Sequence, residues 1–151
     1  MKKHLIILLI ALLGTLSAGA ESAFFKKCDN LDGVTTVYIS KTMMRFAKNM
    51  NLGDGDVNLS SIASKVDEIE IVNTEAPKAV KTLKKLANDS FAGAGYENLV
   101  RVNDDGERTS IMYKTVGKNN EFVIVADEGS EFSVIIIRGP LSVDDITAAV
   151  Q

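Results

Sequence analysis

The fold is decided by residues 97–138, which read ENLVRVNDDGERTSIMYKTVGKNNEFVIVADEGSEFSVIIIR. This stretch is rich in β-branched and aromatic residues, and three groups of turn residues interrupt it, so it predicts four strands. The predicted strands cover residues 97–103, 108–116, 121–127 and 131–138. The first turn contains Asp105-Gly106, a strong hairpin signal because both residues tolerate positive φ. The segment therefore predicts an antiparallel four-stranded meander.

Alternation along these strands divides their side chains between two faces of the sheet. If Asp105 and Gly106 are the central turn residues, Val100 lies opposite Ile111, and the two faces follow from that register. We expect one face to meet the helices; it carries Val100, Val102, Ile111, Tyr113, Phe122, Ile124, Ile135 and Ile137. The other face carries Leu99, Met112, Val123, Val125, Phe132, Val134 and Ile136, with Arg101, Lys114, Asp127 and Arg138 at its rim.

The second face is the candidate partner site. A solvated face of an antiparallel sheet normally carries polar residues, whereas this face is apolar with a charged rim, as at protein interfaces. We expect it to pair with a second copy or with another exported protein through Leu99, Met112, Val123, Val125, Val134 and Ile136. The alternative is that the N-terminal or C-terminal helix covers this face.

The remaining segments predict helices and two further strands. Helices are expected over 24–31, after Ser40, near 59–66, from Thr74 to about 91 and from Ser142 to 150; strands are expected over 34–39 and 68–73. The second of these strands alternates strictly between Glu and Ile, which predicts one wet face. The fold class is α+β: a single domain with a mostly antiparallel sheet of about six strands, a C-terminal four-stranded meander and helices packed mainly on one face.

The N-terminus predicts an exported protein. Lys2 and Lys3 precede the apolar run 5–13, and the small residues 18–20 follow it, the order of a secretory signal peptide. We expect cleavage between Ala20 and Glu21, which leaves residues 21–151 as one domain in the periplasm or outside the cell. A lipid anchor would need a cysteine directly after Ala20. The alternatives are a buried N-terminal helix and an uncleaved anchor.

The composition of residues 21–151 disfavours several functions. This part has 15 basic and 20 acidic residues, a net charge of −5, so nucleic-acid binding is not expected. The only histidine is His4, so the mature chain cannot build a Ser-His-Asp triad, a Cys-His pair or a histidine-containing zinc site. We expect no cofactor and no enzyme activity. The single cysteine, Cys28, reads as a buried thiol, with a partner-linked disulfide as the alternative.

Two other kinds of site were weighed. Asp54-Gly55-Asp56-Val57-Asn58 has the spacing of a calcium loop, but Leu59 and Lys65 stand where the loop needs Gly and Glu, so calcium binding is disfavoured. A pair of carboxylates could run glycoside hydrolysis without histidine. Because the chain has 20 acidic residues, such pairs alone carry no information.

The stretch Val34–Met43, VTTVYISKTM, follows a short helix that contains phenylalanine and Gly33, and resembles the domain-of-unknown-function 4252 family. Ile69–Val72 and Arg138–Ser142 with Ile146 are compatible with that family. The resemblance implies a small exported protein, typical of Bacteroidetes-type bacteria, and implies no reaction and no catalytic residue. We therefore expect an exported, non-enzymatic domain that binds a protein partner or a second copy; the alternative is a carboxylate-based hydrolase or a small-ligand carrier.

Overall fold

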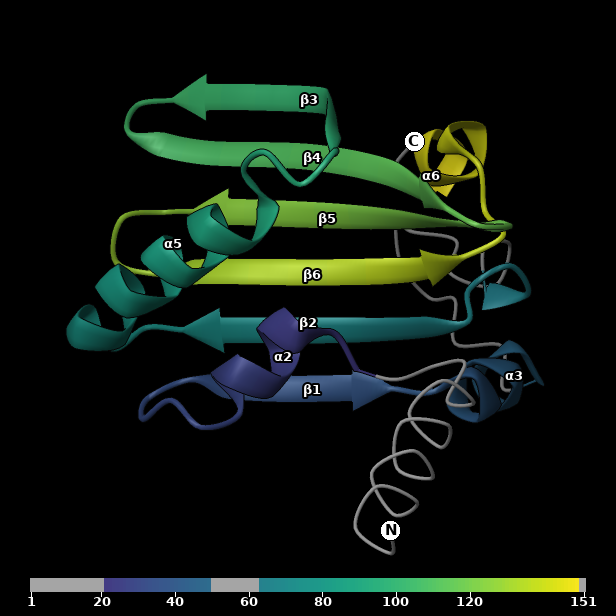
Figure 1. Ribbon diagram of the computed structural model, residues 1–151, viewed down its shortest axis with the longest axis horizontal. Coiled ribbons are helices and arrows are strands. Elements are labelled where there is room, and N and C mark those ends of the chain that lie inside the picture. The colour runs from purple at the N-terminus through teal and green to yellow at the C-terminus, as the bar shows by residue number, and fades with distance from the viewer. Residues whose placement is uncertain (1–20, 50–62, 150–151) are drawn as a thin grey trace, which may run out of the picture.

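The computed structural model describes residues 21–49 and 63–149. These residues form one six-stranded antiparallel sheet and four helices, which confirms the α+β fold and the C-terminal meander (Figure 1). The strand order is β1-β2-β6-β5-β4-β3. The strands are β1 (Thr35–Ile39), β2 (Glu68–Thr74), β3 (Glu97–Asp104), β4 (Glu107–Val116), β5 (Asn119–Asp127) and β6 (Phe132–Gly139). The helices are α2 (Ala23–Cys28), α3 (Lys41–Asn49), α5 (Pro77–Phe91) and α6 (Val143–Ala149).

The turns of the meander fix its register. Asp105 and Gly106 have φ values of 48° and 92° and join β3 to β4 by a two-residue turn, as predicted. The β4–β5 turn is tighter than predicted, because Val116 already pairs with Asn119 and only two residues lie between them. Shortening a turn by two residues preserves alternation. The predicted division of side chains between the two faces therefore holds along β4, β5 and β6.

Leu99 is the exception to this alternation. The β3–β4 register shifts between Asn98 and Val100, which is a β-bulge. The extra residue turns Leu99 toward the opposite face, where it packs against a different hydrophobic cluster from Met112. The predicted partner face therefore loses Leu99.

The prediction of which face meets the helices is wrong for the middle of the sheet. Helices α2 and α5 lie on the face that carries Val123, Val134 and Ile136 (Figure 1). These three side chains are at most 1% exposed. The structure thus has the alternative arrangement, in which the N-terminal helix α2 helps to cover this face. The core here contains Phe24, Phe25, Cys28, Val72, Val80, Leu83, Ala87, Phe91, Val123, Phe132, Val134 and Ile136.

A second, smaller cluster lies on the opposite face. In it, Met44 of α3 and Ile146 of α6 pack with Phe122 and Ile137 of the sheet. Its other buried members are Ala63, Val66 and Leu141. The two faces of the sheet are therefore covered by different helices.

The prediction that the glutamate face of β2 is solvated is also wrong. Glu68 and Glu70 are 5% and 0% exposed, whereas Ile69 and Ile71 on the other side are half-buried. The glutamates can be buried because the β2–β6 register places Arg138 opposite Glu68. Strict alternation identified the residues that share a face, but the partner that permits their burial comes from a distant strand.

Side chains cap the helices largely as predicted. The hydroxyl of Ser40 accepts a hydrogen bond from the Met43 amide, and the Ser142 hydroxyl accepts one from the Asp145 amide. Thr74 instead accepts from the Ala76 amide, and α5 begins at Pro77. Residues 54–58, which have the spacing of a calcium loop but for which calcium binding is disfavoured, lie outside the described residues.

Gly139 sits where two backbone segments approach closely. A Cβ atom there would lie 2.1 Å from the Lys65 carbonyl oxygen and 2.9 Å from the Asp67 amide nitrogen. The same segment is tied to β6 by a 2.7 Å hydrogen bond from the Asp67 amide to the Arg138 carbonyl. Both are backbone atoms, so the contact cannot be relieved by a change of side-chain rotamer.

We expect Gly139→Ala to lower the free energy of unfolding by about 2 kcal/mol or more, because it forces the two backbone segments apart. Urea denaturation at neutral pH measures the change. The matched control is Gly129→Ala. A Cβ atom there meets nothing within 4 Å, so the variant should lose only about 1 kcal/mol in the free energy of unfolding from the positive φ of 81°. Equal losses in the two variants would contradict the close-approach argument.

Candidate ligand-binding groove and a buried charged cluster

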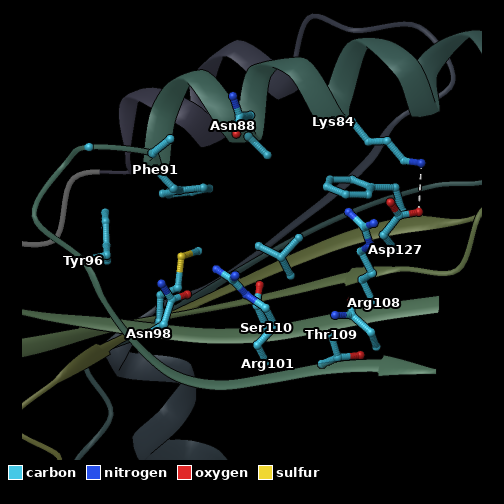
Figure 2. A pocket seen from close by; sticks show the side chains of 17 residues that line it. Lys84, Asn88, Phe91, Tyr96, Asn98, Arg101, Arg108, Thr109, Ser110 and Asp127 are labelled. Atoms are coloured by element: carbon cyan, nitrogen blue, oxygen red, sulfur yellow. Dashed lines mark ion pairs between the residues drawn. The ribbon is translucent and has the colours of Figure 1, made fainter. Parts of the chain in front are cut away.

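A groove lies between α5 and the β3–β4 hairpin. Helix α5 crosses the sheet in front of β6 and β5, while β3 and the outer part of β4 extend beyond it (Figure 1). The space between them has a volume of about 770 Å³ and opens to solvent. Figure 2 shows the side chains that line it, with the helix on one side and the strands on the other.

The wall on the helix side is one stripe of α5. Lys84, Ala87, Asn88 and Phe91 line the groove at i, i+3, i+4 and i+7, the spacing of one helical face. Phe91 meets Tyr96 edge to face, with the ring centroids 5.6 Å apart, and Tyr96 closes one end. The apolar floor comes from the sheet, through Met112, Val125 and Phe132. The groove is therefore amphipathic, with an apolar floor between polar walls.

Three cations and one carboxylate line the groove. Lys84 Nζ lies 2.9 Å from Asp127 Oδ1, and Arg108 lies opposite Asp127 in the β4–β5 register. Partial burial opposes ionisation of Asp127, but the hydrogen bond from Lys84, the bond from the Gly129 amide and the charge of Arg108 together lower its pKa. Asp127 thus stays ionised and is engaged by Lys84.

Arg101 has no such partner. Within residues 21–49 and 63–149, its side chain makes no hydrogen bond and no ion pair, and the same holds for the side chains of Asn88, Asn98 and Ser110. All four line the groove (Figure 2). The groove therefore offers several hydrogen-bond donors that no other described part of the protein uses.

A second charged site lies on the same sheet face, at the end of β6. Arg138 contacts three carboxylates: its Nη1 lies 2.6 Å from Glu68 Oε1 and 3.1 Å from Glu70 Oε1, and its Nε lies 2.5 Å from Glu121 Oε2. The guanidinium group is largely buried, and the Glu70 side chain is fully buried. Three acids thus share one base, which leaves an excess of negative charge when all are ionised.

Further hydrogen bonds complete this charged cluster. Tyr38 donates to Glu68 over 2.8 Å, and Tyr96 donates to Glu121. The Ser22 amide and hydroxyl donate to the two oxygens of Glu70, each over 2.6 Å. Together with the bonds from Arg138, these donors reach all six oxygens of the three carboxylates.

The tyrosines and the arginine have shifted pKa values. Burial and the hydrogen bond to Glu68 raise the pKa of Tyr38 to about 12, and burial and Glu121 also raise the pKa of Tyr96. Burial alone would lower the pKa of Arg138, but its bonds to Glu121 and Glu68 outweigh this and raise it. At neutral pH the two hydroxyls are therefore donors and the guanidinium is charged.

Five of the six residues of the expected partner face lie together in one hydrophobic cluster, and one lies on the other face. Val123, Val134 and Ile136 lie in the core under α2 and α5. Leu99 packs on the other face, as described above. Met112 and Val125 pack against the same cluster, and of the six residues only these two also line the groove, on its floor. Of the two residues at the expected cleavage point, Ala20 lies outside the described residues and Glu21 is half-buried.

The sequence placed Arg101 on the rim of a face. It did not identify Arg101, Arg108 and Ser110 as residues of a groove. The signal was present, because alternation from the Asp105-Gly106 turn already puts all three on one face. The missing fact was the path of α5, which converts that face into a groove.

Cys28 is buried, as predicted. Its side chain is in the core, and burial, with smaller contributions from the charges of Asp29 and Glu70, raises its pKa to about 12. Among the described residues, no group of three or more His, Cys, Asp or Glu is placed to hold a metal ion. No helix in residues 21–49 or 63–149 has the length and apolar character needed to cross a membrane.

The sheet also carries an apolar row on the face opposite the groove. One residue from each strand contributes, and consecutive members are register partners: Val37, Ile71, Ile135, Ile124, Ile111 and Val100. The end residues Val37 and Val100 are 42% and 44% exposed, and the four isoleucines are half-buried. We call these six residues the apolar row.

Comparison with known proteins identifies the family but no characterised relative. No curated protein and no solved structure matches the chain. Residues 25–149 match a family described as a domain of unknown function (DUF4252). The match covers every helix and strand described above apart from the first two residues of α2. The chain therefore belongs to the DUF4252 family.

Proposed function

We propose that this protein is an exported, non-catalytic binding domain and that the groove beside α5 is its binding site. The observation that carries the proposal is the set of unused donors in the groove, above all Arg101, over the apolar floor of Met112 and Val125. Concave sites with an apolar lining and a few convergent polar groups are the usual form of ligand sites. This favours the small-ligand carrier, one of the alternatives from the sequence, over a partner face made of core residues.

The state of the carboxylates supports binding over catalysis. A general acid or base must reach the proton that it transfers, within about 3 Å. In the charged cluster, all six carboxylate oxygens already accept hydrogen bonds from Arg138, Tyr38, Tyr96 and Ser22. In the groove, Asp127 is engaged by Lys84. The carboxylates of the charged cluster and of the groove are thus occupied within the fold.

A second candidate function is self-association through the apolar row. The row crosses the whole sheet; its ends are exposed, and its middle is half-buried where Ile124 and Ile135 pack against the second cluster. Contiguous exposed apolar patches on monomers often mark interfaces. Because each copy presents the same row, two copies could pack face to face about a two-fold axis. This retains the expected homodimer but moves it to the face opposite the one expected from the sequence.

We also propose that residues 1–20 are removed after Ala20, so that the exported chain begins at Glu21. The Ser22 amide donates to Glu70 Oε1 over 2.6 Å. Backbone bond lengths hold successive amide nitrogens within about 3.7 Å of each other. A free α-ammonium on Glu21 would therefore lie within about 6 Å of that oxygen. It would add a positive charge beside a cluster in which three carboxylates share one guanidinium.

Groove binding predicts that the exported protein binds N-phenyl-1-naphthylamine, a neutral fluorescent probe, in a saturable 1:1 manner. Ser110→Phe should abolish this binding because its ring would fill the space between Arg101 and Val125, the register neighbours of Ser110. Probe fluorescence measures it. The matched control is Val102→Phe on the opposite face of β3, which should bind as the unmodified protein does. Equal binding by both variants would exclude the groove.

Self-association predicts a dimer in light scattering that persists on dilution and in reductant. Val37→Lys with Val100→Lys places a charge at each end of the apolar row and should give a monomer with little change in melting temperature, since both residues are exposed. Val116→Lys is the control, because Val116 is also exposed but lies outside the row. A monomer at every concentration before mutation would refute this candidate.

Cleavage after Ala20 predicts that mass spectrometry of the exported protein gives a chain beginning at Glu21. The α-amine should have a pKa above its ordinary value of about 8, because nearby carboxylates favour the charged form. The resulting stabilisation is complete below pH 8 or so and is lost as the pH rises through the folded-state pKa. Glu70→Gln should lower the α-amine pKa, measured by NMR titration, and exposed Glu75→Gln should leave it unchanged. A different N-terminal residue would refute the proposal.

A further inference from the structure

We propose that the groove recognises an anionic group, a carboxylate or a phosphate, on an amphipathic small molecule, and that Arg101 and Arg108 hold that group. This inference rests on the proposed function, because it names the class of ligand for the same groove. It is carried by the placement of the two arginines, the donors around them and the apolar floor beside them.

The hairpin places the two arginines close together. Arg101 pairs with Ser110, and Arg108 is two residues before Ser110 on the same strand, so the arginines are diagonal neighbours on one face. Diagonal pairs across antiparallel strands are about 7–8 Å apart at Cα, within reach of long side chains. The nearest groove carboxylate, Asp127, is bonded to Lys84. The two guanidinium groups therefore line one groove, with Arg108 beside Asp127 and Arg101 without an acidic partner among the residues that line it.

The surrounding polar groups suit an oxyanion. Arginine presents planar donors that match carboxylate and phosphate geometry. Ser110, directly opposite Arg101 in the register, adds a hydroxyl, and Asn98 adds an amide group from β3, while Asn88 lies across the groove on the helix (Figure 2). None of these side chains bonds to another described residue. The donors are thus available without breaking a contact of the fold.

The apolar floor indicates an amphipathic ligand instead of a free inorganic anion. Met112 and Val125 on the floor and Phe91 on the helix wall line the same groove as the arginines. Burial of an apolar body against them would contribute roughly 25 cal/mol per Å². A ligand that combines one negative charge with an apolar or aromatic body therefore complements both parts of the groove.

The groove is positively charged, whereas the chain as a whole is negatively charged. The full sequence has a net charge of −3, yet Lys84, Arg101 and Arg108 face only Asp127 among the charged residues that line this groove. A cationic site on an acidic protein concentrates anionic ligands locally, while the overall charge does not favour polyanions such as nucleic acids. This favours a small anionic ligand.

The test compares two probes that share one aromatic scaffold. 8-Anilino-1-naphthalenesulfonate carries a sulfonate, and N-phenyl-1-naphthylamine is its neutral counterpart. The exported protein should bind the sulfonate probe about tenfold more tightly, and 0.5 M NaCl should remove most of that preference by screening. Equal affinities would overturn the anionic class while the groove remained a binding site. If neither probe binds, the proposed function itself fails.

Arginine variants assign the preference to this site. Arg101→Gln and Arg108→Gln should each weaken binding of the sulfonate probe about fivefold to tenfold and leave the neutral probe unchanged, because only the charged contact is lost. Both arginines are exposed, so the fold should be retained, which circular dichroism and the melting temperature would show. Arg45→Gln, an exposed arginine on α3, is the matched control. A loss in the control equal to that in the groove variants would overturn the assignment.

Displacement of the sulfonate probe separates the two anion sources. Decanoate, decyl phosphate and neutral decanol carry the same chain with different head groups. We expect at least one of the two anions to displace the probe and decanol to fail at the same concentration. Displacement by decanoate alone assigns a carboxylate, and displacement by decyl phosphate alone assigns a phosphate. Displacement by decanol at equal strength would overturn the proposal.

Discussion

Arg138 lies where the N-terminal strand pair meets the C-terminal meander, and its contacts join the two. It extends from β6 to Glu68 and Glu70 on β2 and to Glu121 on β5, so one side chain bridges three neighbouring strands. Buried ion pairs contribute little net stability, because desolvation opposes the attraction. They are more effective at specifying one arrangement. A one-residue slip of β6 would turn Arg138 to the other face and leave three carboxylates without a base.

That register also determines where the groove lies. With β2 paired to β6, the order of the sheet ends in the β3–β4 hairpin, which is the part farthest from α2. Helices α2 and α5 bury the central strands, and α5 leaves the hairpin beyond it uncovered on that face (Figure 1). The exposure of the polar residues of the hairpin therefore follows from the topology. They lie where the helix layer ends, so Arg101 and Ser110 face the side of a helix across an open space (Figure 2).

The division of the meander into two faces could be predicted because a two-residue turn and strict alternation determine it. Which face the helices cover could not be predicted, because both faces are apolar: Val123 and Val134 on one, Ile124 and Ile135 on the other. Leu99 was misplaced because a bulge leaves no local signature in the sequence. Glu68 and Glu70 appeared solvated because their partner, Arg138, is about 70 residues away along the chain. Such errors arise where tertiary contacts override a local pattern.

The charged cluster and the groove, which lie on the same face, differ in how many of their polar groups are hydrogen-bonded within the protein. This difference indicates a structural role for the cluster and a binding role for the groove. In the charged cluster, every carboxylate oxygen accepts a hydrogen bond, which is the expected state of buried polar groups. In the groove, the unused groups are a guanidinium, which can only donate, and a hydroxyl and two amides, which can donate or accept; none makes a bond within the described chain. Water can satisfy them while the groove is empty. Because the charged member of this set is a cation with no acceptor of its own, the group that replaces that water most favourably is an acceptor with negative charge.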